Sequence, residues 1–267
     1  MSDLVADTGA MRVRLDEADW CAAYAGAGSP GFDGWATPRT LSGTTAVTGP
    51  PPEERFVDLL RVRDRAPVVV TSATTSGASG VLAELATDLT SCVCVARRLA
   101  VPTTAGEPTR ALEGVEVSGV PVGRLVDEVL RTLPPVPAPS PLAAADLPEE
   151  LTAAFGLALR RGDARTVDAV CADRGWSAVP EVLLALVHEL VGSATVTVHR
   201  PGASPVVGHW QLTRRGWVEL VPVPSGVVRH VPRSREDIGR SLVAALATTT
   251  DAVLRDADRA ADEGEDR

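Results

Sequence analysis

Alternate positions over 206–212 predict a strand with two different faces, with Val206, Gly208, Trp210 and Leu212 on one of them. A tight turn at 214–216 follows, and a second strand carries the chain back over 217–223. We expect Val218 and Leu220 to rejoin the face of Trp210. The other face is then expected to mix apolar and polar side chains: Val207, His209, Gln211, Trp217 and Glu219.

Both halves of the chain show the same order of predicted elements: a helix, three strands, a long loop and a closing helix. Residues 77–95 align without a gap with residues 202–220, so that Leu85 corresponds to Trp210. The closing helices are expected at 118–130 and 234–246. Strands joined by short hairpins, with helices packed on them, predict an α+β protein. We therefore expect two pseudo-symmetric repeats, each an antiparallel β-sheet unit with flanking helices.

Changes in composition divide the chain into six segments. The first repeat is expected at 54–133 and the second repeat at 146–250. The others are an N-terminal strand and helix at 1–28, a flexible Gly/Pro/Ser/Thr-rich segment at 29–53, a Pro-rich linker at 134–145 and an acidic C-terminal tail at 251–267.

Net charge and terminal sequence restrict the class of partner. The formal net charge of −9 argues against nucleic-acid and anionic-membrane partners, since both require a basic surface. The N-terminus lacks the basic and apolar regions of a signal peptide, and the long uncharged stretches are too rich in Ser and Thr to span a bilayer. These features predict a cytoplasmic protein.

Catalytic and metal-binding patterns are weak in this sequence. A GxGxxG match at 26–31 follows a predicted helix rather than the strand that a dinucleotide site requires. The four cysteines lack the spacing of a CxxC redox pair or a zinc site, which favours buried free thiols. His188, His199, His209 and His230 fall on different predicted elements. We expect a protein that is not an enzyme and holds no cofactor or metal.

The order of these elements resembles the EspG family, the cytosolic chaperones of type VII (ESX) secretion. Residues 12–20 resemble that family's opening strand and helix, and 146–198 resemble its second opening segment. Residues 206–223 and 234–246 resemble its C-terminal strand pair and last helix. One departure is 29–52, which stands where these proteins usually carry a longer helical segment.

This resemblance implies a chaperone that binds helical secreted proteins of the PE/PPE or related small helical type and keeps them soluble for export. In the family, the client's helical tip docks on the sheet and on the loop after the first long strand. The corresponding loop here is expected at Thr74, Thr75, Ser76, Gly77 and Ala78.

The sheet face that carries His209 and Trp217 is expected to complete the binding surface, because an exposed Trp often anchors an interface. Helices of the other repeat could instead cover this face. A second possible function is a non-catalytic regulatory protein that binds a small ligand in the cleft between the repeats.

Overall fold

The computed structural model describes residues 11–39, 53–102, 104, 106–136 and 142–265, and within them eleven strands form one sheet. In chain order the strands are β1 (Met11–Leu15), β2 (Val68–Ser76), β3 (Ser79–Thr87), β4 (Ser91–Ala100), β5 (Arg110–Ala111), β6 (Val115–Pro121), β7 (Ala145–Pro148), β8 (Leu190–His199), β9 (Val206–Thr213), β10 (Gly216–Val223) and β11 (Val227–Arg233). Their order across the sheet is β1-β6-β4-β3-β2-β8-β9-β10-β11-β7, with β5 added to β4. Every pair is antiparallel, and the predicted α+β class is confirmed.

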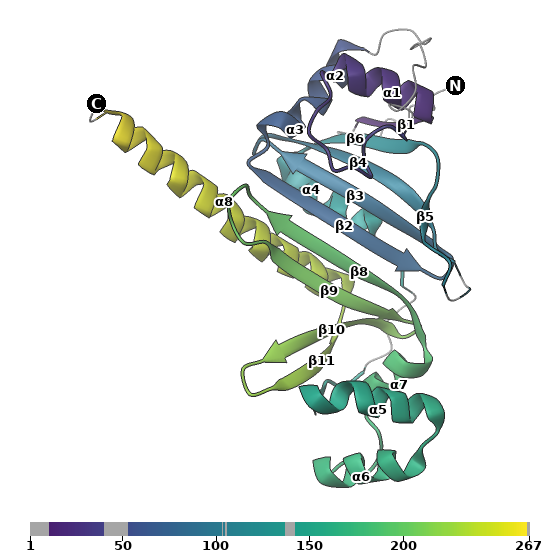
Figure 1. Ribbon diagram of the computed structural model, residues 1–267. Helices are drawn as coiled ribbons and strands as arrows, with labels where there is room; N and C mark the ends of the chain where they lie inside the picture. The colour runs from purple at the N-terminus through teal and green to yellow at the C-terminus, as the bar shows by residue number, and fades with distance from the viewer. Residues whose placement is uncertain (1–10, 40–52, 103, 105, 137–141, 266–267) are drawn as a thin grey trace.

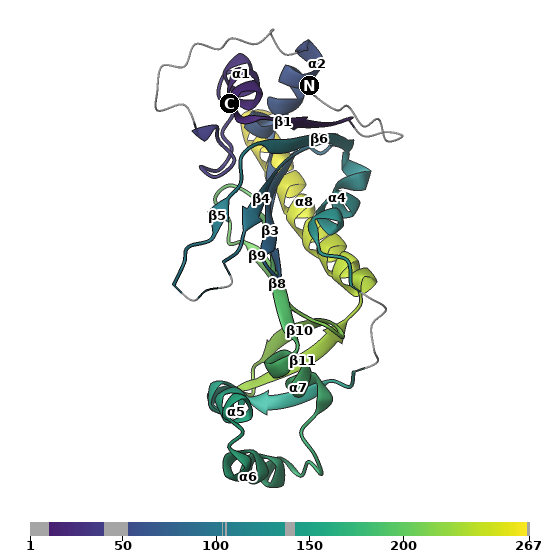
Figure 2. The ribbon, with the colours of Figure 1, turned by 90° about the vertical axis from the view of Figure 1, so that its right-hand side faces the viewer.

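Helices lie on both faces of this sheet, as Figure 1 and Figure 2 show. They are α1 (Glu17–Gly26), α2 (Glu54–Leu60), α3 (Val62–Arg65), α4 (Leu125–Thr132), α5 (Glu149–Arg161), α6 (Ala164–Arg174), α7 (Glu181–His188) and α8 (Arg235–Glu265), with a 3-10 turn at Val122–Arg124 before α4. We call the face under α4 and α8 the α4/α8 face. The opposite face carries α1–α3 at one end and α5–α7 at the other, and we call it the open face (Figure 2).

Three apolar clusters form the core. The largest lies on the α4/α8 face and joins both halves, since Leu85 and Trp210 pack there with Ile238 and Leu242 of α8. A second cluster lies between α1–α3 and the first half of the sheet on the open face. The third lies under α5 and α7. The two halves therefore share one core on the α4/α8 face and have separate cores on the open face.

The strand order reads the same from both ends of the sheet. β2 and β8 pair at the centre, followed outward by β3 and β9, then β4 and β10, then β6 and β11. Thr87 pairs with Cys92 and Leu212 pairs with Trp217, so the two hairpins share the register that the sequence alignment implies. Superposing the halves tests the pseudo-symmetry, which stays a prediction.

The expectation of a flexible segment at 29–53 is wrong for residues 29–39, while 40–52 lie outside the described residues. Phe32 and Ala36 are buried in the core beside α1. The indole Nε1 of Trp20 donates a 2.9 Å hydrogen bond to the carbonyl oxygen of Ala36. Apolar side chains placed among the Gly and Pro residues thus anchor an irregular segment that has no helical or strand periodicity.

Within the expected tail at 251–267, residues 251–265 continue the closing helix, and 266–267 lie outside the described residues. α8 runs unbroken from Arg235 to Glu265, which makes it about 46 Å long. Val253 still packs against the central core, and Arg200 forms an ion pair with Asp256. No structural boundary therefore occurs at residue 250. Within the expected linker, residues 137–141 lie outside the described ones and β7 begins at Ala145.

Candidate partner-binding face

The middle of the open face is built by β2, β8 and β9, between the helices at its two ends (Figure 1). Register places Ala73 opposite Thr195, and Thr195 opposite His209, so their side chains share this face. Ala73 and His209 are exposed, and Val207 is 57% exposed. We call this surface the open strip: Thr71, Ala73, Thr75, Ser193, Thr195, Thr197, Val207, His209 and Gln211.

His209 is held in one orientation by its two neighbours on the open strip. Its Nδ1 lies 2.8 Å from the hydroxyl of Thr195, and its Nε2 lies 2.7 Å from Nε2 of Gln211. Both ring nitrogens have a polar partner within hydrogen-bond distance on the open strip. The two contacts therefore hold the ring in one orientation on this surface.

An apolar pocket of about 230 Å³ adjoins the open strip beneath α5 and α7. Leu190, at the start of β8, is 50% exposed beside it, and Gln211 belongs to both surfaces. His230 is buried at its base, where burial lowers the pKa and favours the neutral ring. We call it the leucine pocket: Leu147, Thr152, Phe155, Gly156, Leu159, Leu183, Leu186, Val187, Leu190, Gln211, Leu220 and His230.

The loop expected at 74–78 is mostly strand. Thr74, Thr75 and Ser76 belong to β2, and only Gly77 and Ala78 form the exposed turn to β3. Thr74 is buried on the α4/α8 face, where its hydroxyl donates a 3.0 Å hydrogen bond to the carbonyl oxygen of Thr132. Thr75 points to the open face and contacts Ser193. The strand continues because β8 pairs with it as far as Ser76.

Trp217 is not exposed, so the expected face is wrong at this position. Its side chain is 2% exposed and packs in the core beside Trp210 on the α4/α8 face. The β9–β10 turn contains two residues, because Thr213 pairs with Gly216. This one-residue difference from the expected turn moves every side chain of β10 to the opposite face. Val218, rather than Trp217, therefore shares the face of His209.

The leucine pocket was missed in the sequence, although a signal for it is present. Leu183, Leu186, Val187 and Leu190 follow the i, i+3, i+4, i+7 spacing of one helix face. Val182 and Ala185, on another side of the same helix, are also buried. When a helix is apolar on almost all sides, one face can pack against the core and another face can line a pocket or contact a partner.

Reactive groups are few within the described residues. No cluster there of three His, Cys, Asp or Glu side chains could hold a metal ion. Burial raises the pKa of Cys92 to about 12, and it also raises the pKa of Cys94, so neither thiol is a ready nucleophile. Among the helices that the structure describes, none is both long and apolar enough to cross a membrane.

Neither a family model nor a curated protein matches this chain. Among solved structures, the Mycobacterium tuberculosis type VII secretion system chaperone EspG5, in complex with a PE25–PPE41 dimer, aligns with a TM-score of 0.58. The alignment covers 88% of this chain and 95% of that chain at 12% identity. The chain has the fold of EspG5. The resemblance to the EspG family is thus confirmed at the level of the fold.

Two Caulobacter crescentus structures, a β sliding clamp and pol III β, align with TM-scores of only 0.14 and 0.13. They share 10% and 12% identity with this chain over 86% of its length, and 68% and 67% of theirs.

Proposed function

We propose that this protein is a type VII (ESX) secretion chaperone that binds helical secreted proteins of the PE/PPE or a related type in the cytosol. It keeps such clients soluble for export and acts without catalysis or a cofactor. The observation that carries this proposal is the EspG5 fold over 88% of the chain, combined with an open strip next to the leucine pocket. The EspG5 structure is itself a complex with a PE25–PPE41 dimer.

The surface suits an amphipathic helical tip. The leucine pocket can take apolar client side chains that would otherwise face water, and burial of this kind supplies most of the free energy of association. The open strip offers Thr and Ser hydroxyls and the Gln211 side chain as hydrogen-bond partners. It carries no formal charge, so a helix docks there without leaving a buried charge unpaired.

The exposed turn at Gly77 and Ala78 extends this surface at one end. The amide of Gly77 donates a 2.8 Å hydrogen bond to the carbonyl oxygen of Val191, which places the turn beside the start of β8 and Leu190. Two small residues there let a partner approach the backbone closely. In this proposal Thr75, Gly77, Ala78 and His209 remain client contacts, whereas the buried Thr74 and Trp217 support the sheet.

The alternative function placed a small ligand in a cleft between the repeats. Strands β2 and β8 instead pair directly over eight residues, from Val69 opposite His199 to Ser76 opposite Gly192. A continuous sheet therefore joins the repeats at this point, and we favour the chaperone function.

The test is a titration with the recombinant PE/PPE-like dimer from the source organism, followed by calorimetry. We expect Leu190→Glu to weaken binding at least tenfold, about 1.4 kcal/mol, because it brings a charge to the mouth of an apolar pocket. His209→Ala is also expected to weaken client binding, because it removes a proposed client contact on the open strip. The matched control is Leu254→Glu, since Leu254 on α8 is 51% exposed against 50% for Leu190.

Folding of each variant is checked by its thermal midpoint. Wild-type affinity in both Leu190→Glu and His209→Ala would contradict the assigned surface. Failure of the wild-type protein to bind any such dimer would contradict the function itself.

A further inference from the structure

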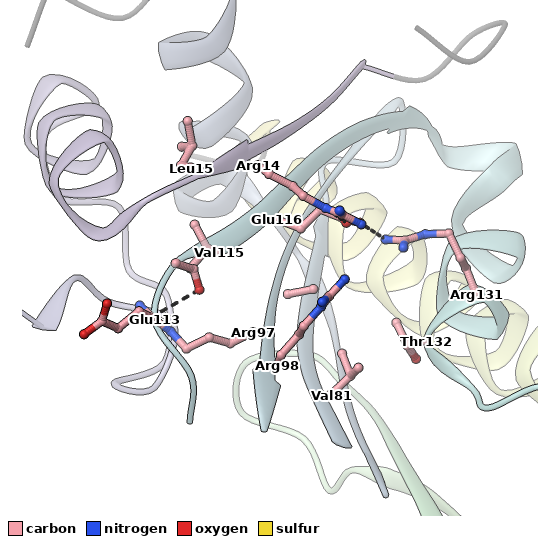
Figure 3. Close-up of a pocket in the computed structure, with 12 residues that line it drawn as sticks. Arg14, Leu15, Val81, Arg97, Arg98, Glu113, Val115, Glu116, Arg131 and Thr132 are labelled. Atoms are coloured by element: carbon pink, nitrogen blue, oxygen red, sulfur yellow. Dashed lines mark hydrogen bonds and ion pairs between the residues drawn. The ribbon is translucent and has the colours of Figure 1, made fainter. Parts of the chain in front are cut away.

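A second pocket, of about 330 Å³, lies on the α4/α8 face at the end of the sheet that contains β1. Strands β1, β3, β4 and β6 and the C-terminal end of α4 line it (Figure 3). The client surface proposed above lies on the opposite face. This pocket is therefore a separate site, and its ligand need not displace a client.

Three guanidinium groups, those of Arg12, Arg14 and Arg131, meet around the carboxylate of Glu116, and Nε of Arg12 lies 3.5 Å from its Oε1. Nε of Arg14 lies 3.2 Å from Glu116 Oε2, and Nη2 of Arg131 lies 2.7 Å from Glu116 Oε1. The exposed Arg98 points toward the same space in Figure 3, and no ion pair within the described residues engages it. Glu113, the other acidic residue of the lining, points away from them (Figure 3). The pocket therefore has an excess of positive charge.

The groups behind the pocket do not cancel this excess. Glu128 is buried, but Arg12 pairs with it at 3.0 Å and Arg131 at 2.8 Å, and Ser118 donates a further hydrogen bond. The carbonyls at the end of α4 would also repel an anion. Arg235 reduces this repulsion, because its guanidinium donates hydrogen bonds to two of these carbonyl oxygens, those of Leu130 and Leu133.

From this geometry we infer that the pocket binds the phosphate group of a small anionic molecule. A guanidinium presents paired N–H donors that match phosphate oxygens, and Arg98 and the solvent-facing part of Arg14 have such donors available. The volume lies at the small end of ligand sites, and Val81 supplies an apolar contact for the rest of the molecule. The overall charge of −9 disfavours a long polyanion.

The test is calorimetry on the full chain at low ionic strength, with inorganic phosphate and ribose 5-phosphate as probes and ribose as the uncharged control. We expect both phosphate compounds to bind and ribose not to bind. Tighter binding of ribose 5-phosphate would identify a phosphate ester as the ligand, and equal binding would identify free phosphate. Arg98→Ala is expected to weaken both at least tenfold, because it removes a guanidinium that is available to the phosphate. Arg98 is exposed and forms no ion pair with any residue that the structure describes, so the fold should be unaffected.

Arg55→Ala is the matched control, since Arg55 is an exposed arginine on α2 at the other face, and we expect wild-type affinity from it. Glu116→Gln is expected to tighten binding, because it removes the carboxylate that competes for Arg14 and Arg131. Absence of phosphate binding, an unchanged affinity in Arg98→Ala, or equal binding of citrate would each overturn the inference. None of these results bears on client binding, which Leu190→Glu tests separately.

Discussion

Arg97 joins the irregular segment 29–39 to the sheet, and we expect its replacement by Met to release that segment. Its side chain is fully buried. Nη1 lies 2.8 Å from Glu17 Oε2, Nε donates to the carbonyl oxygen of Trp35 at 2.9 Å, and Nη2 donates to that of Thr37 at 3.1 Å. Arg97→Met keeps most of the hydrocarbon chain and removes all of these donors.

The cost follows from what remains behind. Breaking one partner out of a buried ion pair costs about 3–5 kcal/mol, because the other charge is left uncompensated. Glu17 is 14% exposed, so water can partly replace the guanidinium, and the lower end of this range applies. We expect a loss of about 3 kcal/mol, a large part of the 5–15 kcal/mol by which domains are typically stable.

Urea unfolding measures this loss, and hydrogen exchange shows where it acts. Amides in 32–37 are expected to exchange faster in Arg97→Met, because two carbonyls of the segment have lost their donors. The control is Arg61→Met, which removes an exposed ion pair with Asp58 and is expected to cost less than about 1 kcal/mol. A loss below 1 kcal/mol in Arg97→Met, with unchanged exchange, would show that apolar packing alone holds the segment.

Two further predictions concern buried carboxylates and the central strand pair. Burial raises the pKa of Glu128, but hydrogen bonds from Arg131 and Ser118 outweigh this effect and hold the pKa below 4.5. The carboxylate therefore stabilises the fold above pH 4.5, and this contribution is lost as the pH falls below 4.5. For Glu84, burial outweighs the hydrogen bonds, and the pKa in the folded protein lies above 4.5. Its contribution to stability is therefore present below pH 4.5 and is lost as the pH rises through the raised pKa. In urea unfolding from pH 4 to pH 7, the stability advantage of the wild type over Glu128→Gln should therefore grow, and its advantage over Glu84→Gln should shrink; parallel curves would contradict both assignments. Gly192→Ala places a Cβ in a steric clash with the Thr75 carbonyl oxygen, so β2 and β8 must separate there, and we expect a lower thermal midpoint and a loss of about 2 kcal/mol or more.

The sequence predicted those parts of the fold that depend on local pattern. Alternation over 206–212 identified β9, and the repeat identified the shared register of the two hairpins. The sequence pattern failed where a single residue in a turn, or a contact distant in sequence, decides which face a side chain takes. Because the turn before Gly216 has two residues, Trp217 is buried on the α4/α8 face rather than on the face of His209. The alternation of faces along β10 was itself predicted correctly.

The candidate site was predicted less well than the fold, because it depends on long-range pairing. His209 was identified as part of a surface, but its neighbours Thr195 and Ala73 come from strands whose pairing no local pattern reveals. The same holds for Arg97, which satisfies carbonyls about sixty residues away in sequence. Nothing in a Gly- and Pro-rich segment indicates that a distant arginine orders it.

The pairing of β2 with β8 also sets a delay in the synthesis of this chain. β2 ends at Ser76 and β8 begins at Leu190, about 115 residues later. At roughly 5–20 residues per second, translation leaves the outer edge of β2 without its partner for roughly 6–23 s. That edge is a nine-residue strand with free backbone donors and acceptors, which can pair with other chains. A protein proposed to shield the surfaces of others thus exposes an unpaired strand of its own until its second half leaves the ribosome.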